Sequence, residues 1–387
     1  MISTKQAINK ILENKTALES VDLKLINTLK YVLAKDVFSP ISLPPFSQSA
    51  MDGYAISGEY ESYKVVDEIK AGDTKTVKIN NGEATRIFTG AKIPEGTTAI
   101  AKQEIVARKK DEITLLENVK KGTSIRKKGE EIKINQLAIK KGTTINPAAI
   151  GLLSSLGFTK INVFRKPKIK LIVTGNELVK PGEKFQEGKI YESNSVTIKS
   201  ALISQGFDCE ISFVKDDFSE TKNTIEKAIN NNDLVIITGG ISVGDYDFVG
   251  ESLSEIGVKE VFYKVNQKPG KPLYYGEKEN VKVFALPGNP AAALTCFYVY
   301  VLTALKLMTG NKTPLLEKKE AITTHNYTKK GDREHLLKAQ LSDGKVTVHK
   351  GQSSAMLSSF IEANCLLYIP AEINEIKKNE LVEVFIL

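Results

Sequence analysis

Cysteine is scarce in this chain, and its three copies lie far apart. Cys209, Cys296 and Cys365 form no CxxC pair and have no histidine at a short spacing. The pattern therefore indicates neither a zinc site nor a disulfide framework. We expect a protein of the reducing cytoplasm.

Long apolar runs are also missing. Residues 1–12 alternate charged and apolar side chains and lack the apolar core of a signal peptide. The longest apolar stretch, residues 291–305, has about 15 residues, which is too short for a comfortable membrane span. We expect a protein that is neither exported nor embedded in a membrane.

The composition is that of a folded protein with a basic balance. With 387 residues the chain has room for roughly two to four domains, and its 41% apolar and 26% charged residues are close to the averages for folded proteins. The net charge of +8 favours an anionic partner such as nucleic acid, an acidic membrane surface or a phosphorylated small molecule. Much of the excess lies in Lys-Lys-Gly clusters at 120–122, 127–129 and 140–142, which are typical of solvated turns.

Four regions are predicted along the chain. Residues 1–35 have the pattern of two short amphipathic helices, and 44–140 that of a β-rich inserted domain. A helix starting at Asn146-Pro147 and a strand at 161–164 group residues 141–167 with 1–43 as an N-terminal linking domain. Strands alternate with helices, including 194–204 and 219–230, over 168–310, which predicts a doubly wound α/β domain. Residues 311–387 return to short strands and form a C-terminal β domain.

Three apolar runs in the α/β region end in loops of small and polar residues. The loops are Thr174-Gly-Asn-Glu177, Thr238-Gly-Gly-Ile-Ser-Val-Gly-Asp-Tyr-Asp247 and Leu286-Pro-Gly-Asn-Pro290. Because the carboxyl ends of parallel strands meet at one edge of a sheet, these loops could converge on one crevice. Such a crevice suits phosphate.

The middle loop has the groups best suited to a ligand. Its glycines at 239, 240 and 244 let the backbone approach a ligand closely, and Ser242 offers a hydroxyl. Asp245 and Asp247 are hard oxygen ligands suited to a magnesium ion shared with phosphates. The alternative is an ordinary Gly-Gly turn whose aspartates are caps.

The other loops allow two interpretations each. Glu177 could help to hold a metal or orient a water, or it could be a capping-box residue. Asn289-Pro290 sets a helix start whose free N–H groups favour an anion, or it is an ordinary capped helix. Lys268 and Lys271 lie in a Pro-rich loop with Lys264 and could clamp an oxyanion, or could be solvated. Asp52 precedes a glycine, and a turn-forming aspartate is the default there.

Seven segments in order along the whole chain together resemble the MoeA family, the molybdopterin molybdenumtransferases, whose eukaryotic relatives include gephyrin. They are Pro45-Phe-Ser-Gln-Ser-Ala-Met-Asp-Gly-Tyr-Ala55, Arg86-Ile-Phe-Thr-Gly-Ala91, Lys127-Lys-Gly-Glu-Glu-Ile132, Thr174-Gly-Asn-Glu-Leu178, Gly239-Gly-Ile-Ser-Val-Gly244, Lys268-Pro-Gly-Lys-Pro272 and Leu286-Pro-Gly-Asn-Pro290. Each segment alone is weak evidence for the family, whereas all seven in this order are specific to it.

The resemblance implies an elongated multidomain chain with a doubly wound, MogA-like α/β domain, a β-rich inserted domain and a C-terminal domain like a β-barrel. It implies a homodimer whose active cleft lies between the α/β domain of one subunit and the β-rich domain of the other. The implied reaction is Mg²⁺-dependent insertion of molybdate into adenylylated molybdopterin with release of AMP. Contact with the molybdopterin adenylyltransferase is a further expectation, whereas nucleic acid and membrane are not expected partners.

The resemblance also implies roles for individual residues. The catalytic set is Asp52, Thr89, Glu177, Asp217 and Asp247, and the metal ligands are Glu177, Asp245 and Asp247. Lys268, Lys271, Arg333 and Ser354 would hold the oxygens of molybdate or phosphate. The remaining substrate-binding residues belong to the three strand-end loops: Thr174, Gly175, Gly239, Gly240, Ser242, Gly244, Asp245, Pro287, Gly288, Asn289 and Pro290.

This chain departs from the commonest family pattern at three positions. Asn176 stands where Asp is usual, which puts the magnesium ligand set in doubt, and Glu131 replaces a frequent Asp. Cys365 replaces a frequent Gly and is expected to affect only a turn. Insertion of tungstate by the same chemistry, hydrolysis of a nucleotide pyrophosphate and a non-catalytic gephyrin-like scaffold are the alternatives to the molybdate reaction.

Overall fold

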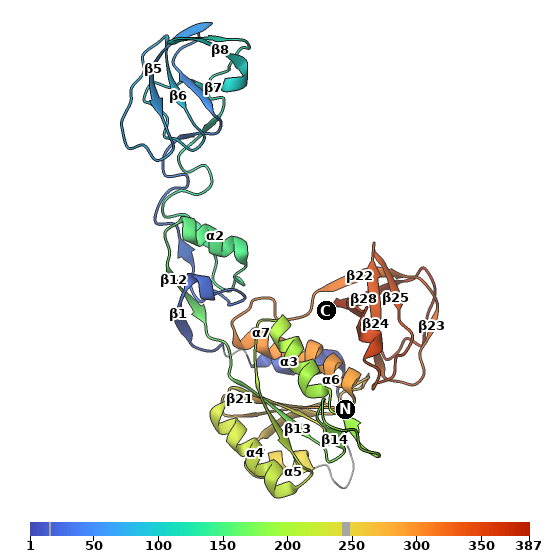
Figure 1. Cartoon of the computed structure of the whole chain (residues 1–387). Helices are drawn as coiled ribbons and strands as arrows, with labels where there is room; N and C mark the ends of the chain where they lie inside the picture. The colour runs from blue at the N-terminus through green and yellow to red at the C-terminus, as the bar shows by residue number, and fades with distance from the viewer. Residues whose placement is uncertain (15–16, 242–247) are drawn as a thin grey trace. The chain divides into compact units, whose positions relative to one another are not determined.

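The computed structural model describes residues 1–14, 17–241 and 248–387 (Figure 1). The chain forms two compact units. One contains residues 1–34, 142–147 and 160–387, and the other contains residues 35–141 and 148–159.

A six-stranded sheet is the centre of the first unit. Its order is β16 (Glu210–Val214), β13 (Ile169–Thr174), β17 (Leu234–Thr238), β21 (Val281–Leu286), β20 (Tyr274–Lys278) and β18 (Lys259–Tyr263). The first four strands are parallel and the last two are antiparallel to their neighbours. The central strands of a parallel sheet are covered on both faces, so they are expected to be apolar on both sides. All five residues of β17 are buried, as expected.

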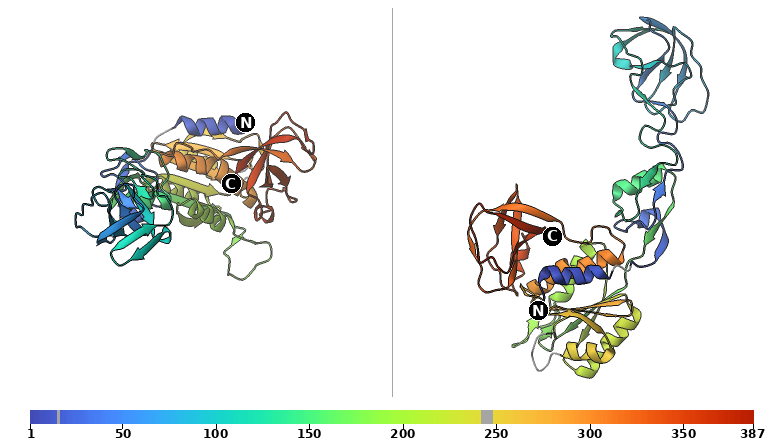
Figure 2. Two further views of the ribbon diagram at one scale, coloured as in Figure 1. Left: turned by 90° about the horizontal axis from the view of Figure 1, so that it is seen from above. Right: turned by 180° about the vertical axis from the view of Figure 1, so that it is seen from behind.

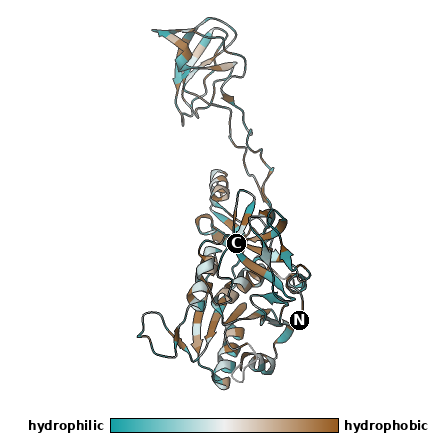
Figure 3. Cartoon of the chain, turned by 90° about the vertical axis from the view of Figure 1, so that its right-hand side faces the viewer, coloured by the Kyte–Doolittle hydropathy of each residue, from teal (hydrophilic) through white to brown (hydrophobic). Residues whose placement is uncertain are grey.

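Helices cover both faces of this sheet, which confirms the doubly wound α/β prediction. The helices α3 (Asn194–Ser204), α6 (Pro290–Cys296) and α7 (Leu302–Met308) lie on one face, and α4 (Phe218–Asn231) and α5 (Phe248–Ile256) lie on the other (Figure 1). Alternate residues of β17 enter opposite cores: Leu234 and Ile236 pack on the α3 side, and Val235 and Ile237 pack on the α4 side. Figure 3 shows the strands of this sheet as apolar.

The segment from Pro290 to Met308 is one continuous helix, in which five residues of π-helix (Phe297–Val301) separate α6 from α7. Its 19 residues and mean hydropathy of 1.7 make it the one helix of the described chain that is long and apolar enough to span a membrane. The apolar run of residues 291–305 lies within this helix, which is longer than the run because it also includes Pro290 and Lys306-Leu-Met308. Within an apolar stretch of 18 residues of this helix, 83% is buried in the protein, as in the core helix of a folded domain.

The N-terminal region differs from the prediction of two helices. Helix α1 (Thr4–Glu13) begins with a capping box between Ser3 and Gln6 and lies beside α7 (Figure 2). The second segment is instead a strand, β1 (Ser20–Lys24), paired antiparallel with β12 (Lys160–Phe164), followed by a 3-10 turn (Leu25–Asn27). Its side chains alternate between exposed and half-buried, which is the period of a strand rather than of a helix.

The C-terminal residues form a sheet that closes on itself. Strand β24 (Glu334–Ser342) pairs with both β25 (Lys345–Val348) and β26 (Cys365–Ile369), and β22 (Lys318–Thr323) and β28 (Leu381–Ile386) complete the ring. This closure confirms the barrel-like prediction. The short strand β19 (Gln267–Lys268) adds to β24 in parallel. The expectation that Cys365 affects only a turn was wrong, because this residue begins β26 and is fully buried in the barrel core.

The second unit contains another six-stranded sheet. Its order is β7 (Ala99–Lys102), β4 (Gly53–Ile56), β6 (Glu83–Ile87), β5 (Ser62–Ile69), β9 (Glu112–Leu115) and β8 (Val106–Lys109). Separate apolar clusters form on its two sides, with Tyr54 and Ile56 in one and Ala55 and Ile87 in the other. Helix α2 (Pro147–Ser155) begins at the predicted proline, and the glycines of the three Lys-Lys-Gly clusters all have positive φ, as turns require.

Four further pairs of short strands lie outside the larger sheets. They are β2 (Val37–Phe38) with β11 (Leu137–Ile139), β3 (Gln48–Ser49) with β10 (Ile125–Arg126), β14 (Leu178–Val179) with β15 (Ile190–Tyr191), and β23 (Tyr327–Thr328) with β27 (Glu375–Ile376). Two further 3-10 turns cover Gln103–Ile105 and Ser358–Phe360.

Candidate functional site

The carboxyl ends of β13, β17 and β21 meet at one cavity of about 510 Å³. In the register of the sheet, Val173 lies opposite Thr238, and Thr238 lies opposite Leu286. The three predicted loops therefore start at the same edge. Seven predicted site residues line the cavity: Thr174, Glu177, Gly239, Pro287, Gly288, Asn289 and Pro290. The other lining residues include Tyr191, Glu192, Asn194, Thr238, Pro272 and Ala355.

Three buried polar atoms at this cavity have no hydrogen-bond partner in the described part of the chain. They are Thr174 Oγ1, Thr238 Oγ1 and Asn194 Oδ1. The amide of Asn194 is oriented by its Nδ2, which donates to the Gly288 carbonyl oxygen at 2.8 Å. Because an unsatisfied buried polar atom costs about 1–3 kcal/mol, this cavity is suited to a ligand with hydrogen-bonding groups.

Neither Asn194 nor Thr238 was a predicted site residue. Thr238 was given as the first residue of the middle loop without a role of its own, and Asn194 as the first residue of a helix. Each nevertheless stands where a strand or helix meets the carboxyl edge of the sheet, and that position could have indicated both.

The Gly-Gly turn after β17 packs directly on β13. Gly239 has φ +88°, and a Cβ there would lie 2.7 Å from the Thr174 carbonyl oxygen. A Cβ on Gly240 would lie 2.9 Å from Thr174 Oγ1. A side chain at either position would separate the two strand ends, so both glycines are required by close approach as well as by conformation.

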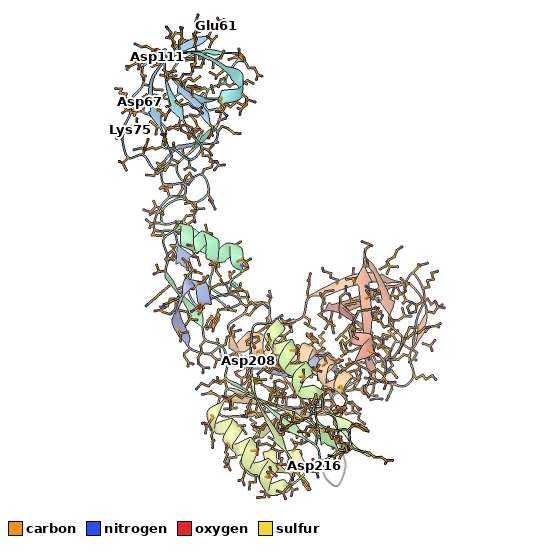
Figure 4. All side chains as sticks on the ribbon, viewed as in Figure 1. Glu61, Asp67, Lys75, Asp111, Asp208 and Asp216 are labelled. Carbon is orange, nitrogen blue, oxygen red and sulfur yellow. The ribbon has the colours of Figure 1, made fainter. Side chains whose placement is uncertain are left out.

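Glu177 folds back over the loop that follows β13. A Cβ on Gly175 would lie 2.7 Å from the Glu177 carboxylate. The same loop is tied to the end of β16, since the Asn176 N–H donates to Asp216 Oδ2 at 2.9 Å and Asn176 Oδ1 accepts from the Asp216 N–H at 3.2 Å. Asp216 is at the edge of the α/β sheet (Figure 4).

Asp217, a predicted catalytic residue, is the N-cap of α4 in the structure. Its side chain accepts from the Glu220 N–H at 2.7 Å. The carboxylate that faces the loop of Asn176 and Glu177 is that of Asp216, which was not predicted. The spacing Asp217-x-x-Glu220 is a helix-start signature and could have shown that Asp217 has a capping partner.

The start of α6 contacts a loop of the C-terminal barrel. Asn289 Nδ2 donates to Ser354 Oγ at 3.0 Å, and the Ala292 N–H donates to the Ser354 carbonyl oxygen at 3.0 Å. The side chain of Asn289 therefore binds Ser354 and makes no capping hydrogen bond to its own helix. Ser354 lies beside the Pro287–Pro290 segment as well as in the barrel.

Positive charge gathers where β19 joins the barrel. Arg333 Nη1 donates to the Gln267 carbonyl oxygen at 3.5 Å, and Lys268 is paired with His335 in the sheet. Burial, together with the positive charges of Lys268, Lys329 and Arg333, lowers the pKa of His335 to about 4. Lys268 and Arg333 thus share one cationic cluster, whereas Lys271 is exposed on the following loop.

Asp52 and Thr89 meet in the β-rich unit. The N–H and the hydroxyl of Thr89 donate to Asp52 Oδ1 at 2.8 and 2.7 Å. These two bonds, and more weakly the charge of Arg86, hold the pKa of Asp52 below its ordinary value. Arg86 also donates to the Gly53 carbonyl oxygen and lies over the rings of Tyr54 and Phe88.

Four predicted residues lie outside the described residues: Ser242, Gly244, Asp245 and Asp247. Within the described ranges no group of three or more His, Cys, Asp or Glu side chains is close enough to hold a metal ion. Two of the three predicted magnesium ligands, Asp245 and Asp247, are among these four residues.

A doubly wound sheet with glycine-rich loops and a polar cavity at its carboxyl edge is the arrangement of an enzyme domain suited to a polar ligand. Residues 2–157 match the MoeA N-terminal region (domain I and II), residues 170–307 match the family described as "Probable molybdopterin binding domain", and residues 320–387 match the MoeA C-terminal region (domain IV).

Relatives match over the full length. The chain is 30% identical over 399 aligned positions to the molybdopterin molybdenumtransferase of Staphylococcus aureus, with all of this chain and 95% of the relative covered. The Staphylococcus epidermidis enzyme is equally similar over 401 positions. The MoeA protein of Pyrococcus horikoshii OT3 is 30% identical, with a TM-score of 0.85 and complete coverage of both chains. The chain belongs to the MoeA family of molybdopterin molybdenumtransferases, and it is a transferase of molybdenum cofactor biosynthesis.

Proposed function

We propose that this enzyme inserts molybdate into adenylylated molybdopterin in a Mg²⁺-dependent reaction that releases AMP. The observation that supports this most strongly is the cavity at the ends of β13, β17 and β21, which combines glycine-rich backbone, unpartnered polar atoms and a carboxylate. A pterin nucleotide needs all three, because its rings offer hydrogen-bonding edges and its anhydride needs close backbone approach and a metal.

The described residues supply binding and orientation. Gly239, Gly240 and Gly288 let the ligand approach the strand ends, and Thr174, Thr238 and Asn194 offer hydrogen bonds to its polar edges. Ser354, with Lys268 and Arg333 of the cationic cluster, is proposed to hold oxyanion oxygens. Two charge-assisted contacts of this kind could each contribute about 1.5–3 kcal/mol.

Magnesium would be held by Glu177, Asp245 and Asp247. The described member of this set, Glu177, has the hard carboxylate oxygens that Mg²⁺ prefers and lines the cavity. Bound magnesium would neutralise charge on the phosphoanhydride. In the proposed step, a water oxygen attacks the anhydride phosphorus and the P–O bond to the leaving phosphate breaks, so that AMP departs; Glu177 can orient that water.

Asp52 and Thr89 belong to the β-rich unit and are proposed to act on the same substrate. The bonds from Thr89 keep the Asp52 carboxylate ionised and fixed, which suits a group that orients a ligand. We further propose a cytoplasmic homodimer that receives its substrate from the molybdopterin adenylyltransferase. Sedimentation of the purified protein would test the dimer, and co-purification would test the contact.

The reaction is tested with purified protein, adenylylated molybdopterin and Mg²⁺, with molybdate or tungstate in parallel. AMP release with molybdate, lost when EDTA removes the metal, is the expected result. Release with tungstate alone would change the oxyanion assignment. No AMP with either oxyanion, from protein that is folded, would overturn the proposed reaction.

A further inference from the structure

Lys338 is a buried lysine in the C-terminal barrel. It lies in the middle of β24, opposite Leu366 of β26, and only 1% of its surface is exposed. It forms no salt bridge among the described residues. Burial lowers its pKa to about 8. A buried cation without an acidic partner is costly, so its retention calls for a specific role.

The ammonium group of Lys338 binds one loop at three places. Its Nζ donates to the carbonyl oxygens of Gly351, Ser353 and Met356 at 2.9, 3.2 and 2.9 Å. We call residues 351–356 the oxyanion loop. The backbone of Lys338 is also paired with the Gln352 side chain, whose Oε1 accepts from the Lys338 N–H at 3.0 Å and whose Nε2 donates to the Lys338 carbonyl oxygen at 2.9 Å. One residue thus fixes most of the loop.

This arrangement sets the direction of the loop's N–H groups. In a trans peptide the N–H points opposite to the carbonyl of the preceding residue. Because the carbonyls of Gly351 and Ser353 point at Lys338, the N–H groups of Gln352 and Ser354 point away from it. Neither N–H has a partner among the described residues. Outward N–H groups from a loop of this kind are suited to an anion.

The same loop meets the candidate site. Ser354 accepts hydrogen bonds from Asn289 and from the Ala292 N–H, and Ala355 lines the cavity at the ends of β13, β17 and β21. Lys338 itself is absent from that lining. Its effect on a ligand is therefore indirect and passes through the oxyanion loop.

We propose that Lys338 is a positioning residue, which holds the oxyanion loop from inside the barrel so that Ser354 presents its hydroxyl and N–H to the oxyanion substrate. This inference rests on the proposed function, since it needs Ser354 to bind an oxyanion. The loop has no regular secondary structure of its own, so without Lys338 the entropy cost of ordering its backbone would be met by fewer contacts.

The test compares Lys338→Met, Lys338→Arg and the matched control Lys350→Met, which removes an exposed lysine one residue before the oxyanion loop. Met keeps the length of the side chain but has no donor. Arg keeps the charge, but its planar guanidinium group can reach only some of the three carbonyl oxygens. AMP release is followed as a function of molybdate concentration, and amide hydrogen exchange is measured at Ala292 and Met356, whose N–H groups bind the Ser354 and Ser353 carbonyls.

For Lys338→Met we expect the KM for molybdate to rise at least about tenfold while kcat stays within about threefold, since loss of charged hydrogen bonds costs about 1.5–3 kcal/mol. Arg should restore part of this loss, and Lys350→Met should match the parent. A purely structural role would lower the amount of active enzyme, and hence kcat, without changing KM. That result, or an unchanged KM with unchanged exchange, would overturn the proposal.

Hydrogen exchange separates this inference from the reaction itself. If the parent enzyme releases no AMP, the proposed function fails, but faster exchange at Ala292 in Lys338→Met still supports the positioning of the loop. If the parent is active and the variant exchanges like the parent, the positioning fails alone. Should Lys338→Met not fold, Lys338→Arg is compared with the parent and with Lys350→Met. Its KM for molybdate should then be higher, and its amide exchange faster, than in both of these proteins.

Discussion

Thr89 donates two hydrogen bonds to a single oxygen of Asp52, from its backbone N–H at 2.8 Å and from its hydroxyl at 2.7 Å. The carboxylate is thereby held ionised and in one orientation, even though it is exposed to solvent. Two residues that are 37 positions apart are joined because β4 and β6 are neighbours in the sheet of the β-rich unit.

Thr89→Val should raise the pKa of Asp52. The hydrogen bond from the Thr89 hydroxyl is lost and the one from its N–H remains. The pKa of the Asp52 carboxyl should therefore rise part of the way to its ordinary value. Asp52 is a group with a lowered pKa, so it stays ionised above that pKa and is neutralised as the pH falls through it. The acid limb of activity should therefore move to higher pH in the variant. Carboxyl NMR titration measures the shift, and Thr97→Val, whose hydroxyl binds the Pro94 carbonyl, should leave it unchanged.

Substitutions of Asp217 should affect mainly the stability of the protein, and substitution of Asp216 should affect mainly AMP release. Asp217→Asn keeps an N-cap acceptor and should change the free energy of unfolding by less than about 0.5 kcal/mol, whereas Asp217→Ala should cost about 1 kcal/mol. Asp216→Asn removes the charge that faces the loop of Asn176 and Glu177. We expect the larger loss of AMP release from Asp216→Asn. Equal activity of that variant and the parent, with a large loss in Asp217→Asn, would return the catalytic role to Asp217.

Two glycines at the cavity should respond differently to alanine. Gly239→Ala places a Cβ against the Thr174 carbonyl in a left-handed conformation and should cost about 2 kcal/mol or more of stability. A Cβ on Gly288 would meet its nearest neighbour, Gly239 Cα, at 3.7 Å, which is an ordinary contact. Gly288→Ala should therefore fold normally and raise the substrate KM by partly filling the cavity. Urea unfolding and steady-state kinetics separate the two effects.

Glu177→Gln tests the carboxylate of the first strand-end loop. The variant keeps the size of the side chain and removes its charge, so folding should be preserved while AMP release falls at least about 100-fold. Glu183→Gln is the matched control, because Glu183 is exposed on the loop between β14 and β15. Turnover near that of the parent in Glu177→Gln would remove Glu177 from the active set.

The arrangement of the α/β sheet could be predicted because each of its central strands is an apolar run that stops at a glycine or proline. The bounds predicted for the helix at 194–204 are also those of α3. Residues 20–24 were assigned to a helix because a five-residue strand offers little periodicity, and its pairing with 160–164 is a long-range contact.

Side-chain partners were harder to predict than elements. Whether Asp216 or Asp217 faces the loop of Asn176 depends on where α4 begins, and the bond from the Glu220 N–H to Asp217 lies at that boundary. Lys338 is an ordinary lysine in the sequence, and only the closed barrel buries it. Asn194 gains its role because Gly288 lies next to it in space. The burial of Lys338 and the contact of Asn194 with Gly288 depend on tertiary structure, which the local sequence pattern does not contain.

The most direct test of the proposed reaction is the dependence of AMP release on the oxyanion in a single turnover with enzyme in excess of adenylylated molybdopterin and Mg²⁺ present. If insertion and cleavage are coupled in one site, AMP should appear only when molybdate is added, with one AMP for each molybdenum bound to the pterin. AMP released at the same rate without any oxyanion would show a simple pyrophosphate hydrolase and contradict the account.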